Sequence, residues 1–224
     1  RETGTFRLDD DCVPQAITGE NAVSKVVYTV DASLGEDYAN DCKLIYGNLQ
    51  AAIDALRATK DNEAAYQYVK WSSDGGHESY NLQVPVEINV RYYDNTPDDN
   101  SSAYIYRGTT EVGNYAGSHK PENANLLKDF NRNGADAEHT LTIKAGNSIA
   151  KPWIHHIIIR NSKNIVLDSL AIFSDPVDYD AEEDGVQTKG DNAIEIDVNS
   201  TNWPGLGIGE CSNANILIQN WRKT

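Results

Sequence analysis

The 224-residue chain carries a net charge of −15, from 34 acidic and 19 basic residues. Its length suits one domain with a core of its own. A surface with this much negative charge repels nucleic acid and anionic membranes. The sequence has no run of Lys or Arg that would form a basic patch. An acidic surface can still meet an acidic polymer if divalent cations bridge the two. No run of roughly 18 apolar residues is present, so we predict no membrane insertion.

The first residue is Arg1, and the sequence contains no Met. A secreted chain that has lost its signal peptide would begin this way, and so would an excised fragment. We therefore expect an extracellular or cell-surface protein. Three Cys allow at most one internal disulfide. Cys12–Cys42 is the favoured pair, because both lie in a polar region that a cross-link would stabilise. The alternative is three thiols, with Cys211 buried.

The N-terminal third combines a strand and a helix. Alternating apolar residues predict a strand at Lys25–Val30. Apolar residues at spacings of three and four predict an amphipathic helix over Leu44–Ala58, with Asn48, Asp54 and Arg57 facing away. The pattern of Glu63–Trp71 fits either a short helix or a strand.

Short β-rich runs follow residue 80, each ended by Gly, Asn, Asp or Pro. Such spacing fits a sandwich, a barrel or a β-solenoid. Consecutive apolar residues in Ile157–Ile159 and Ile165–Leu167 favour the solenoid, since half-wet antiparallel strands usually alternate. The predicted strands are Val84–Tyr93, Ala103–Arg107, Thr140–Lys144, His156–Arg160, Asn164–Phe173, Ala193–Val198 and Asn215–Trp221.

Two of these strands begin alike, with Ser, then Asn, then a β-branched run. Asn164 and Asn215 occupy the same place in this pattern, 51 residues apart (215 − 164). That distance fits two coils of about 25 residues or one coil with long loops. Asn at a bend adopts the left-handed conformation at low cost, and its amide can bond to the Asn of the next coil.

Three stretches resemble the pectin lyase-like superfamily of right-handed parallel β-helices. Tyr38–Leu56, which ends in Asn48–Leu56, resembles its N-terminal cap helix. Ile157–Phe173 resembles its repeats, and Gly190–Asp197 resembles a strand of the pectate lyases. Ser200–Trp203 begins the segment that follows in those enzymes, but Pro204–Gly207 then departs from it. The resemblance implies an all-β, right-handed parallel β-helix with a capping α-helix.

We expect two regions, a leader and cap at 1–80 and β-helix coils at 81–224. A β-helix has open ends whose strands need covering. The helix would cover the front, and nothing similar closes the back. We therefore expect the coils to be incomplete, with further coils or self-association at that end.

Acidic residues concentrate between Asp175 and Asp197, and oxygen ligands at such density favour Ca²⁺. The resemblance places a calcium-binding Asp at Asp197, and Glu195 would share its strand face. The alternative is a solvated acidic loop. The predicted metal ligands are Asp184, Asp191, Glu195 and Asp197.

Elimination on a uronic acid needs a base for the proton α to the carboxylate and a cation for the developing charge. The resemblance implies an Arg or Lys base with Ca²⁺, so Lys189 and Arg160 are the catalytic candidates, with Lys144 a further possibility. Each is otherwise a solvated charge. A hydrolase would need two carboxylates, for which Asp168, Asp191 and Asp197 are possible.

Two further features bear on function. His155 and His156 could bind a metal, but neighbours on a strand face opposite ways, so a structural or surface role is favoured. The aromatics Tyr92, Tyr93, Tyr104 and Tyr106 suit stacking on sugar rings, or else packing under loops.

Two functions of different class remain open. The first is an extracellular carbohydrate-active β-helix, acting on an acidic glycan as a Ca²⁺-dependent polysaccharide lyase. The second is a non-catalytic surface, appendage or adhesin β-helix that binds glycans or self-assembles. Fold alone does not decide between them, so whether the chain is an enzyme stays open.

Overall fold

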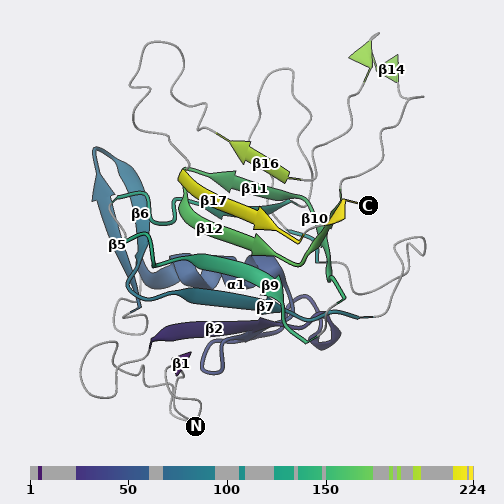
Figure 1. Ribbon diagram of the computed structural model, residues 1–224, viewed down its shortest axis with the longest axis horizontal. Coiled ribbons are helices and arrows are strands. Elements are labelled where there is room, and N and C mark those ends of the chain that lie inside the picture. Colours follow the sequence, from purple (N-terminus) through teal and green to yellow (C-terminus); the bar gives the residue numbers. More distant parts are fainter. Residues whose placement is uncertain are drawn as a thin grey trace.

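The computed structural model describes residues 5–6, 24–60, 68–93, 106–108, 124–133, 136–147, 150–173, 182–183, 186–187, 194–197, 214–220 and 222–223. The described chain is mostly β-structure (Figure 1). Its single α-helix is α1 (Leu49–Arg57), with short 3₁₀ turns η1 (Ala32–Leu34) and η2 (Ala58–Lys60). In these ranges no helix is both long and apolar enough to cross a membrane.

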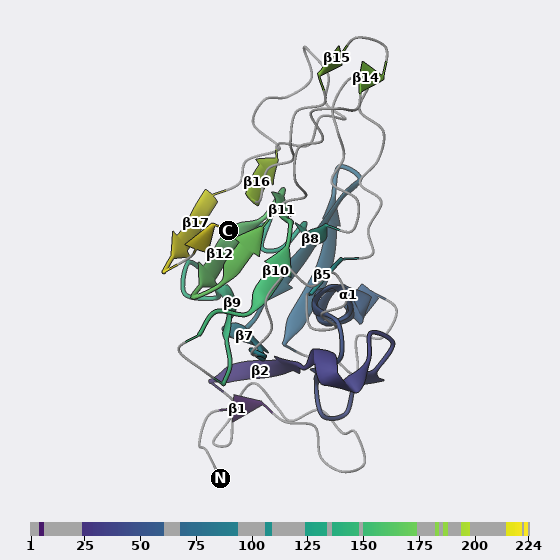
Figure 2. The same ribbon diagram turned by 90° about the vertical axis from the view of Figure 1, so that its right-hand side faces the viewer.

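The largest sheet has eight strands, in the order β17-β12-β9-β7-β2-β4-β3, with β1 beside β2. All of its pairings are parallel except β3 with β4. Figure 2 shows the stack rising from β1 to β17. The strands are β1 (Thr5–Phe6), β2 (Lys25–Val30), β3 (Ala39–Asn40), β4 (Ile45–Tyr46), β7 (Val86–Val90), β9 (Leu141–Ala145), β12 (Lys163–Asp168) and β17 (Ala214–Gln219).

Two smaller sheets have three parallel strands each, in the orders β10-β13-β18 and β16-β11-β8. Two antiparallel hairpins, β5-β6 and β14-β15, complete the described strands. The bounds are β5 (Val69–Asp74), β6 (His77–Leu82), β8 (Asn125–Lys128), β10 (Trp153–His155), β11 (Ile157–Arg160), β13 (Ala171–Phe173), β14 (Glu182–Glu183), β15 (Val186–Gln187), β16 (Ile194–Asp197) and β18 (Arg222–Lys223).

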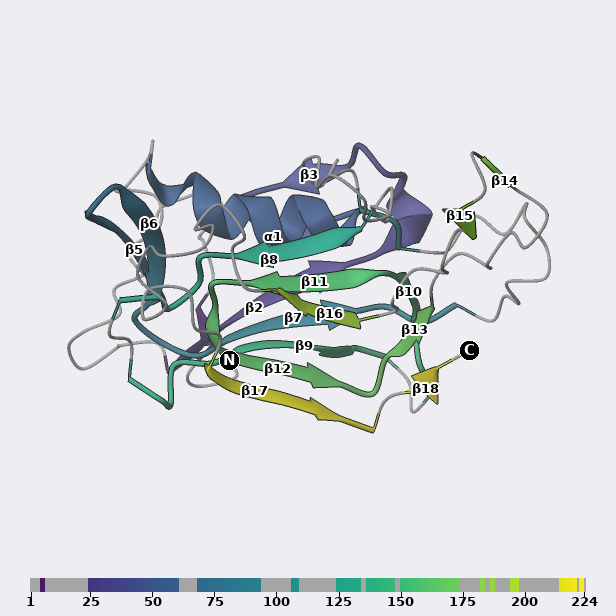
Figure 3. The same ribbon diagram turned by 90° about the horizontal axis from the view of Figure 1, so that it is seen from above.

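The chain visits the three parallel sheets in a fixed order. The run β8, β9, β10 gives one strand to each sheet, and so do the runs β11, β12, β13 and β16, β17, β18. Figure 3, seen from above, shows β8, β11 and β16 running side by side, and β9, β12 and β17 likewise. Parallel pairing therefore arises between strands of successive runs rather than between sequence neighbours.

One large apolar core joins the three sheets. Its members include Ile88 of the eight-stranded sheet, Ile159 of the β16-β11-β8 sheet and Ile172 of the β10-β13-β18 sheet, all fully buried. The expected strand Lys25–Val30 is confirmed as β2, with every second side chain buried. Core residues lie on both sides of residue 80, so the cap region and the later strands share one interior.

The consecutive apolar residues of β11 have a direct explanation. Ile157 and Ile159 face the main core, whereas Ile158 packs with Ala124 and Leu126 in a second, smaller cluster. Both faces of the sheet are buried at this point, so the strand does not alternate.

Helix α1 starts later than predicted and closes the edge of β8. Asn48 does not face away but is the buried N-cap, and its side chain accepts from the backbone N–H of Gln50 at 2.7 Å. The Gln50 amide then pairs with β8, accepting from Leu126 N at 2.6 Å and donating to Leu126 O at 3.3 Å. It thus substitutes for a strand at a sheet edge that would otherwise leave backbone groups unpaired.

The predicted asparagine pairing is confirmed. Asn164 and Asn215 both have left-handed backbones, with φ of 59° and 53°. The Asn215 amide donates to Asn164 Oδ1 at 2.9 Å. Because β12 and β17 are direct neighbours, the spacing of 51 residues corresponds to one step between adjacent strands of this sheet rather than two.

Other expectations fare unevenly. Asn164–Phe173 is two strands, because Ser169 adopts a left-handed φ of 58° between β12 and β13. Strands β6, β8 and β10 were not predicted. Of Glu63–Trp71, which fitted either a helix or a strand, the described strand residues 69–71 belong to β5. Cys42 is disulfide-bonded, which excludes three free thiols. Its expected partner Cys12 lies outside the described residues, as does most of Ala103–Arg107.

Candidate functional site on the β16-β11-β8 sheet

The six predicted site residues divide into two groups. Lys189, Asp184 and Asp191 lie outside the described residues. Arg160 lies on β11, and Glu195 and Asp197 lie on the neighbouring strand β16. Pairing of β11 with β16 therefore places three of the predicted site residues on neighbouring strands.

One row of this sheet gathers charged residues. The register pairs Arg160 with Lys128 on one side and with Asp197 on the other. It also pairs Glu195 with Ile158, two positions before Arg160. Since Leu127 and Ile159 point into the core, the half-buried Lys128 and Arg160 lie on the opposite face.

A buried carboxylate, Asp129, lies where β8 ends. Asp129 is 3 % exposed, and its oxygens lie 3.7 Å from Lys128 Nζ and 3.9 Å from Arg132 Nη1. The Asn161 amide, from the bend after β11, donates to Asp129 Oδ1 at 3.4 Å. Asp129 and Asn161 both have left-handed backbones, with φ of 64° and 49°. Stacked bends thus place cations and a carboxylate at the carboxyl ends of β8 and β11.

Burial and charge act in opposite directions on this carboxyl. Burial raises the pKa of Asp129, whereas Lys128, Arg57, Asn161 and Arg132 act to lower it, and burial prevails. A buried carboxyl with a raised pKa among cations is a common feature of functional sites.

The raised pKa predicts a pH dependence that Asp129→Asn removes. A carboxyl with a higher pKa in the folded than in the unfolded state binds protons more tightly when folded, so it loses stability as pH rises. Between about pH 4, the ordinary Asp value, and pH 7, the wild type should lose stability relative to Asp129→Asn. Urea unfolding of both proteins across this range measures it. Parallel pH profiles would contradict the raised pKa.

The remaining acid–base candidates lie on the eight-stranded sheet and are already paired. Lys144 Nζ lies 3.0 Å from Glu87, which also holds Lys25 at 3.2 Å. Burial acts to raise the pKa of Glu87, but hydrogen bonds from Lys144 and Lys25 lower it overall. Hydrogen bonds from Asn220, Ser169 and Gln219 lower the pKa of Asp168. Lys144 is already ion-paired with Glu87, which argues against it as a base.

The histidine pair is buried at the corner between β10 and β11. His155 and His156 are both fully buried, as a structural role requires. Their rings lie 4.3 Å apart, edge to face, because His156 has a left-handed φ of 38°. The expectation that they face opposite ways is wrong for this reason.

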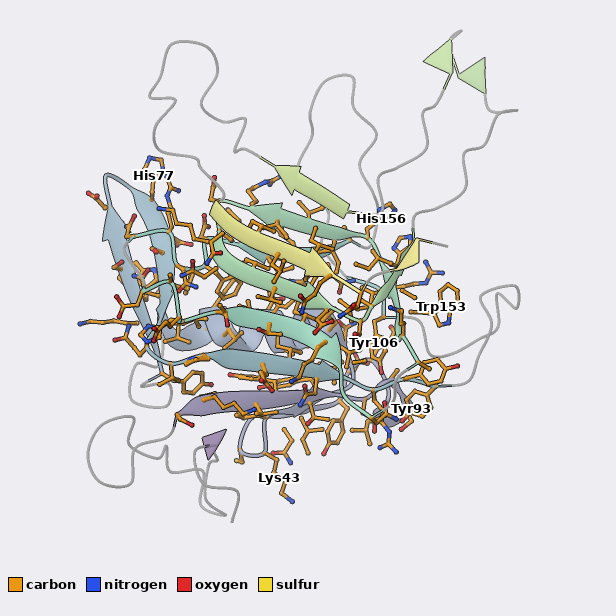
Figure 4. The ribbon with its side chains drawn as sticks, in the orientation of Figure 1. Lys43, His77, Tyr93, Tyr106, Trp153 and His156 are labelled. Atoms are coloured by element: carbon orange, nitrogen blue, oxygen red, sulfur yellow. The ribbon has the colours of Figure 1, made fainter. Side chains whose placement is uncertain are left out.

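The predicted aromatic residues have unequal exposure. Tyr106 is 2 % exposed and donates to Arg91 O at 2.7 Å, so it does not suit stacking on a sugar. Tyr92 and Tyr93 are half-buried, and Tyr104 lies outside the described residues. Figure 4 shows Tyr93, Tyr106, Trp153 and His156 on one side of the molecule, opposite His77.

Sequence reasoning missed Lys128, Asp129 and Arg132. The sequence does hold a repeat that could have revealed them. Leu126–Asp129 and Ile158–Asn161 each have two apolar residues, then a cation, then Asp or Asn. Asp129 and Asn161 are 32 residues apart. Alignment at that spacing would have placed Lys128 beneath Arg160.

In the described part of the chain, no three His, Cys, Asp or Glu residues are grouped to hold a metal ion. Two of the four predicted ligands, Asp184 and Asp191, lie outside it. No protein-family model, curated protein or solved structure matches the chain in comparison.

Proposed function

We propose that the three parallel sheets are the faces of one right-handed parallel β-helix, capped by α1. Three successive runs of strands visit the sheets in the same order, and one core lies between them. The Asn164–Asn215 bond and the Gln50 cap agree with this architecture. We also propose that the chain is a member of the pectin lyase-like superfamily.

On this β-helix, the proposed function is binding of an acidic glycan at the β16-β11-β8 sheet. The observation that carries it is the row Lys128–Arg160–Asp197 beside Asp129 and Arg132. In a chain of net charge −15, cations gathered at the ends of two strands suit the carboxylates of a uronate polymer.

The proposed reaction is β-elimination. Arg160 is the base: once its guanidinium has passed a proton to solvent, the neutral group takes the proton on the carbon α to the uronate carboxylate. The electron pair forms a C=C bond as the β C–O bond breaks, and the leaving sugar oxygen receives a proton from solvent. Lys128 lies beside Arg160 and would offset the negative charge that develops on the carboxylate.

The proposed cofactor is Ca²⁺, held by Asp184, Asp191, Glu195 and Asp197. Glu195 and Asp197 both belong to β16, and carboxylates are the ligands Ca²⁺ prefers. When bound, the ion would neutralise the uronate carboxylate. The disulfide at Cys42 supports the proposed extracellular location, since disulfides persist in oxidising compartments.

An absorbance assay tests the enzyme reading. The whole chain, incubated with a panel of uronate polymers and Ca²⁺, should produce unsaturated sugars that absorb in the ultraviolet. Arg160→Ala should lower the rate by about 100-fold or more, as loss of a base does. Lys144→Ala, an ion-paired lysine on another sheet, should keep the wild-type rate. No signal across the panel, or full activity in Arg160→Ala, rejects β-elimination.

The second candidate is a non-catalytic surface or appendage β-helix that binds glycans or self-assembles. The edge strand β17 favours it, because Leu217 is 47 % exposed and no described strand pairs with its outer edge. Sedimentation analysis decides: a concentration-dependent oligomer without elimination activity supports this candidate.

A further inference from the structure

The tip of α1 and the β5-β6 hairpin form a second cation-rich cluster, which we call the hairpin site. It consists of Arg57, Lys60, Trp71, Glu78 and Tyr80. Lys60 Nζ lies 2.9 Å from Glu78 Oε1, and Arg57 Nη2 lies 3.9 Å from Glu78 Oε2. Tyr80 OH donates to the same Oε2 at 3.1 Å. One carboxylate therefore holds two cations and a phenol.

Each cation of the hairpin site lies over an aromatic ring. Trp71 and Tyr80 are cross-strand partners in the hairpin. Lys60 Nζ lies 5.2 Å from the centre of the Trp71 ring, and Arg57 Cζ lies 5.2 Å from that of Tyr80. Trp71 is half-buried and the Lys60 side chain is 45 % exposed, so moving Lys60 would uncover one face of the indole.

Two N–H donors of the hairpin site lack acceptors. Arg57 Nε and Trp71 Nε1 are buried, and no described group accepts from either. Buried donors are rarely left unpaired, because the loss costs about 1–3 kcal/mol. Two cations face one carboxylate inside the cluster, while Asp54 and Asp129 act on Arg57 from outside it. What the cluster lacks within itself is hydrogen-bond acceptors and a second negative charge. An added anion would supply both.

We propose that the hairpin site binds an acidic sugar, with the sugar ring on Trp71 and its carboxylate between Arg57 and Lys60. The proposal rests on the acidic-glycan function above and extends that site along the edge of the sheet, since Tyr80 N donates to Asp129 O at 2.9 Å. Sugar rings present C–H faces to an indole, and a carboxylate matches the planar guanidinium. Glu78 holds the two cations in the free protein, so it competes with the ligand.

Because Glu78 competes with the ligand, removal of its charge should strengthen binding rather than weaken it. With a galacturonate trisaccharide as the probe, Lys60→Ala and Trp71→Ala should each weaken binding by about tenfold, while Glu78→Gln should tighten it several-fold. A structural role for Glu78 would instead weaken binding or leave it unchanged. Lys43→Ala, an exposed lysine away from the hairpin (Figure 4), should bind as the wild type does.

Tryptophan fluorescence locates the bound sugar. The probe should change the emission of the wild type and of Trp153→Phe, whose Trp lies on the opposite side, but not of Trp71→Phe. If the wild type binds no uronate, the proposed function and this subsite both fail. If it binds, and the hairpin variants match the wild type while Arg160→Ala binds weakly, only the subsite is overturned.

Discussion

Replacing Gln50 by Leu should lower the free energy of unfolding by about 3 kcal/mol, since it leaves buried polar groups unpaired. The Gln50 side chain is 2 % exposed and bonds to both backbone groups of Leu126. It also donates to Asp54 Oδ1 at 2.9 Å. Leu has a similar size but cannot replace these bonds, so the edge of β8 would face α1 with an unsatisfied N–H and C=O.

Urea unfolding followed by circular dichroism measures this loss. Gln83→Leu is the matched control, because Gln83 is half-buried and its amide donates to Asn81 O alone among the described contacts. Its effect should stay within about 0.5 kcal/mol. Equal stabilities for Gln50→Leu and the wild type would mean that α1 does not close the sheet.

Shortening Leu167 to Ala should destabilise the protein by about 3–4 kcal/mol, the usual cost of a cavity in a close-packed core. Leu167 is fully buried and belongs to the core shared by the three sheets. It pairs with Ile143 on β9 and Ile218 on β17. Loss of its side chain would remove contacts with apolar residues on both neighbouring strands.

The neighbouring Val166 supplies the control. Val166 is half-buried and points to the outer face of the same strand, in register with Thr142 and Leu217. Val166→Ala should cost less than about 1 kcal/mol. Thermal unfolding of Leu167→Ala and Val166→Ala compares the stability lost on the inner face of β12 with that lost on its outer face. A larger loss at Val166 than at Leu167 would place the core on the wrong side of the sheet.

Local patterns predicted the parts of the fold that depend on local interactions. The alternation in Lys25–Val30 predicted β2, because one face of that strand is buried and the other is not. The Asn164–Asn215 pairing followed from the ability of Asn to adopt a left-handed bend. The start of α1 was misplaced, because Asn48 acts as an N-cap and the preceding Ile45–Tyr46 pairs as β4.

Other features depend on contacts between distant segments. Strand β8 has only four residues, and its existence depends on pairing with β11. The hairpin β5-β6 includes polar residues on both strands, so it lacks the apolar alternation that identifies a strand. Neither β8 nor the β5-β6 hairpin can be recognised as a strand from its own residues alone.

The candidate site was only partly accessible from sequence. Resemblance to pectate lyases singled out Asp197, and the register then placed Arg160 beside it. Lys128 and Arg132 were missed, because they become neighbours of Asp129 only when β8 pairs with β11. No run of Lys or Arg exists along the chain, but in space Lys128, Arg57 and Arg132 all act on the Asp129 carboxylate.

Calorimetric titration of a polyuronate into the whole chain tests the central claim, binding of an acidic glycan, most directly. We predict measurable binding that weakens as salt rises from about 50 to 500 mM, because exposed ion pairs are screened. A neutral polymer of the same sugar skeleton should release no heat. Absence of binding to any polyuronate, or equal binding of the neutral polymer, would contradict the proposed function.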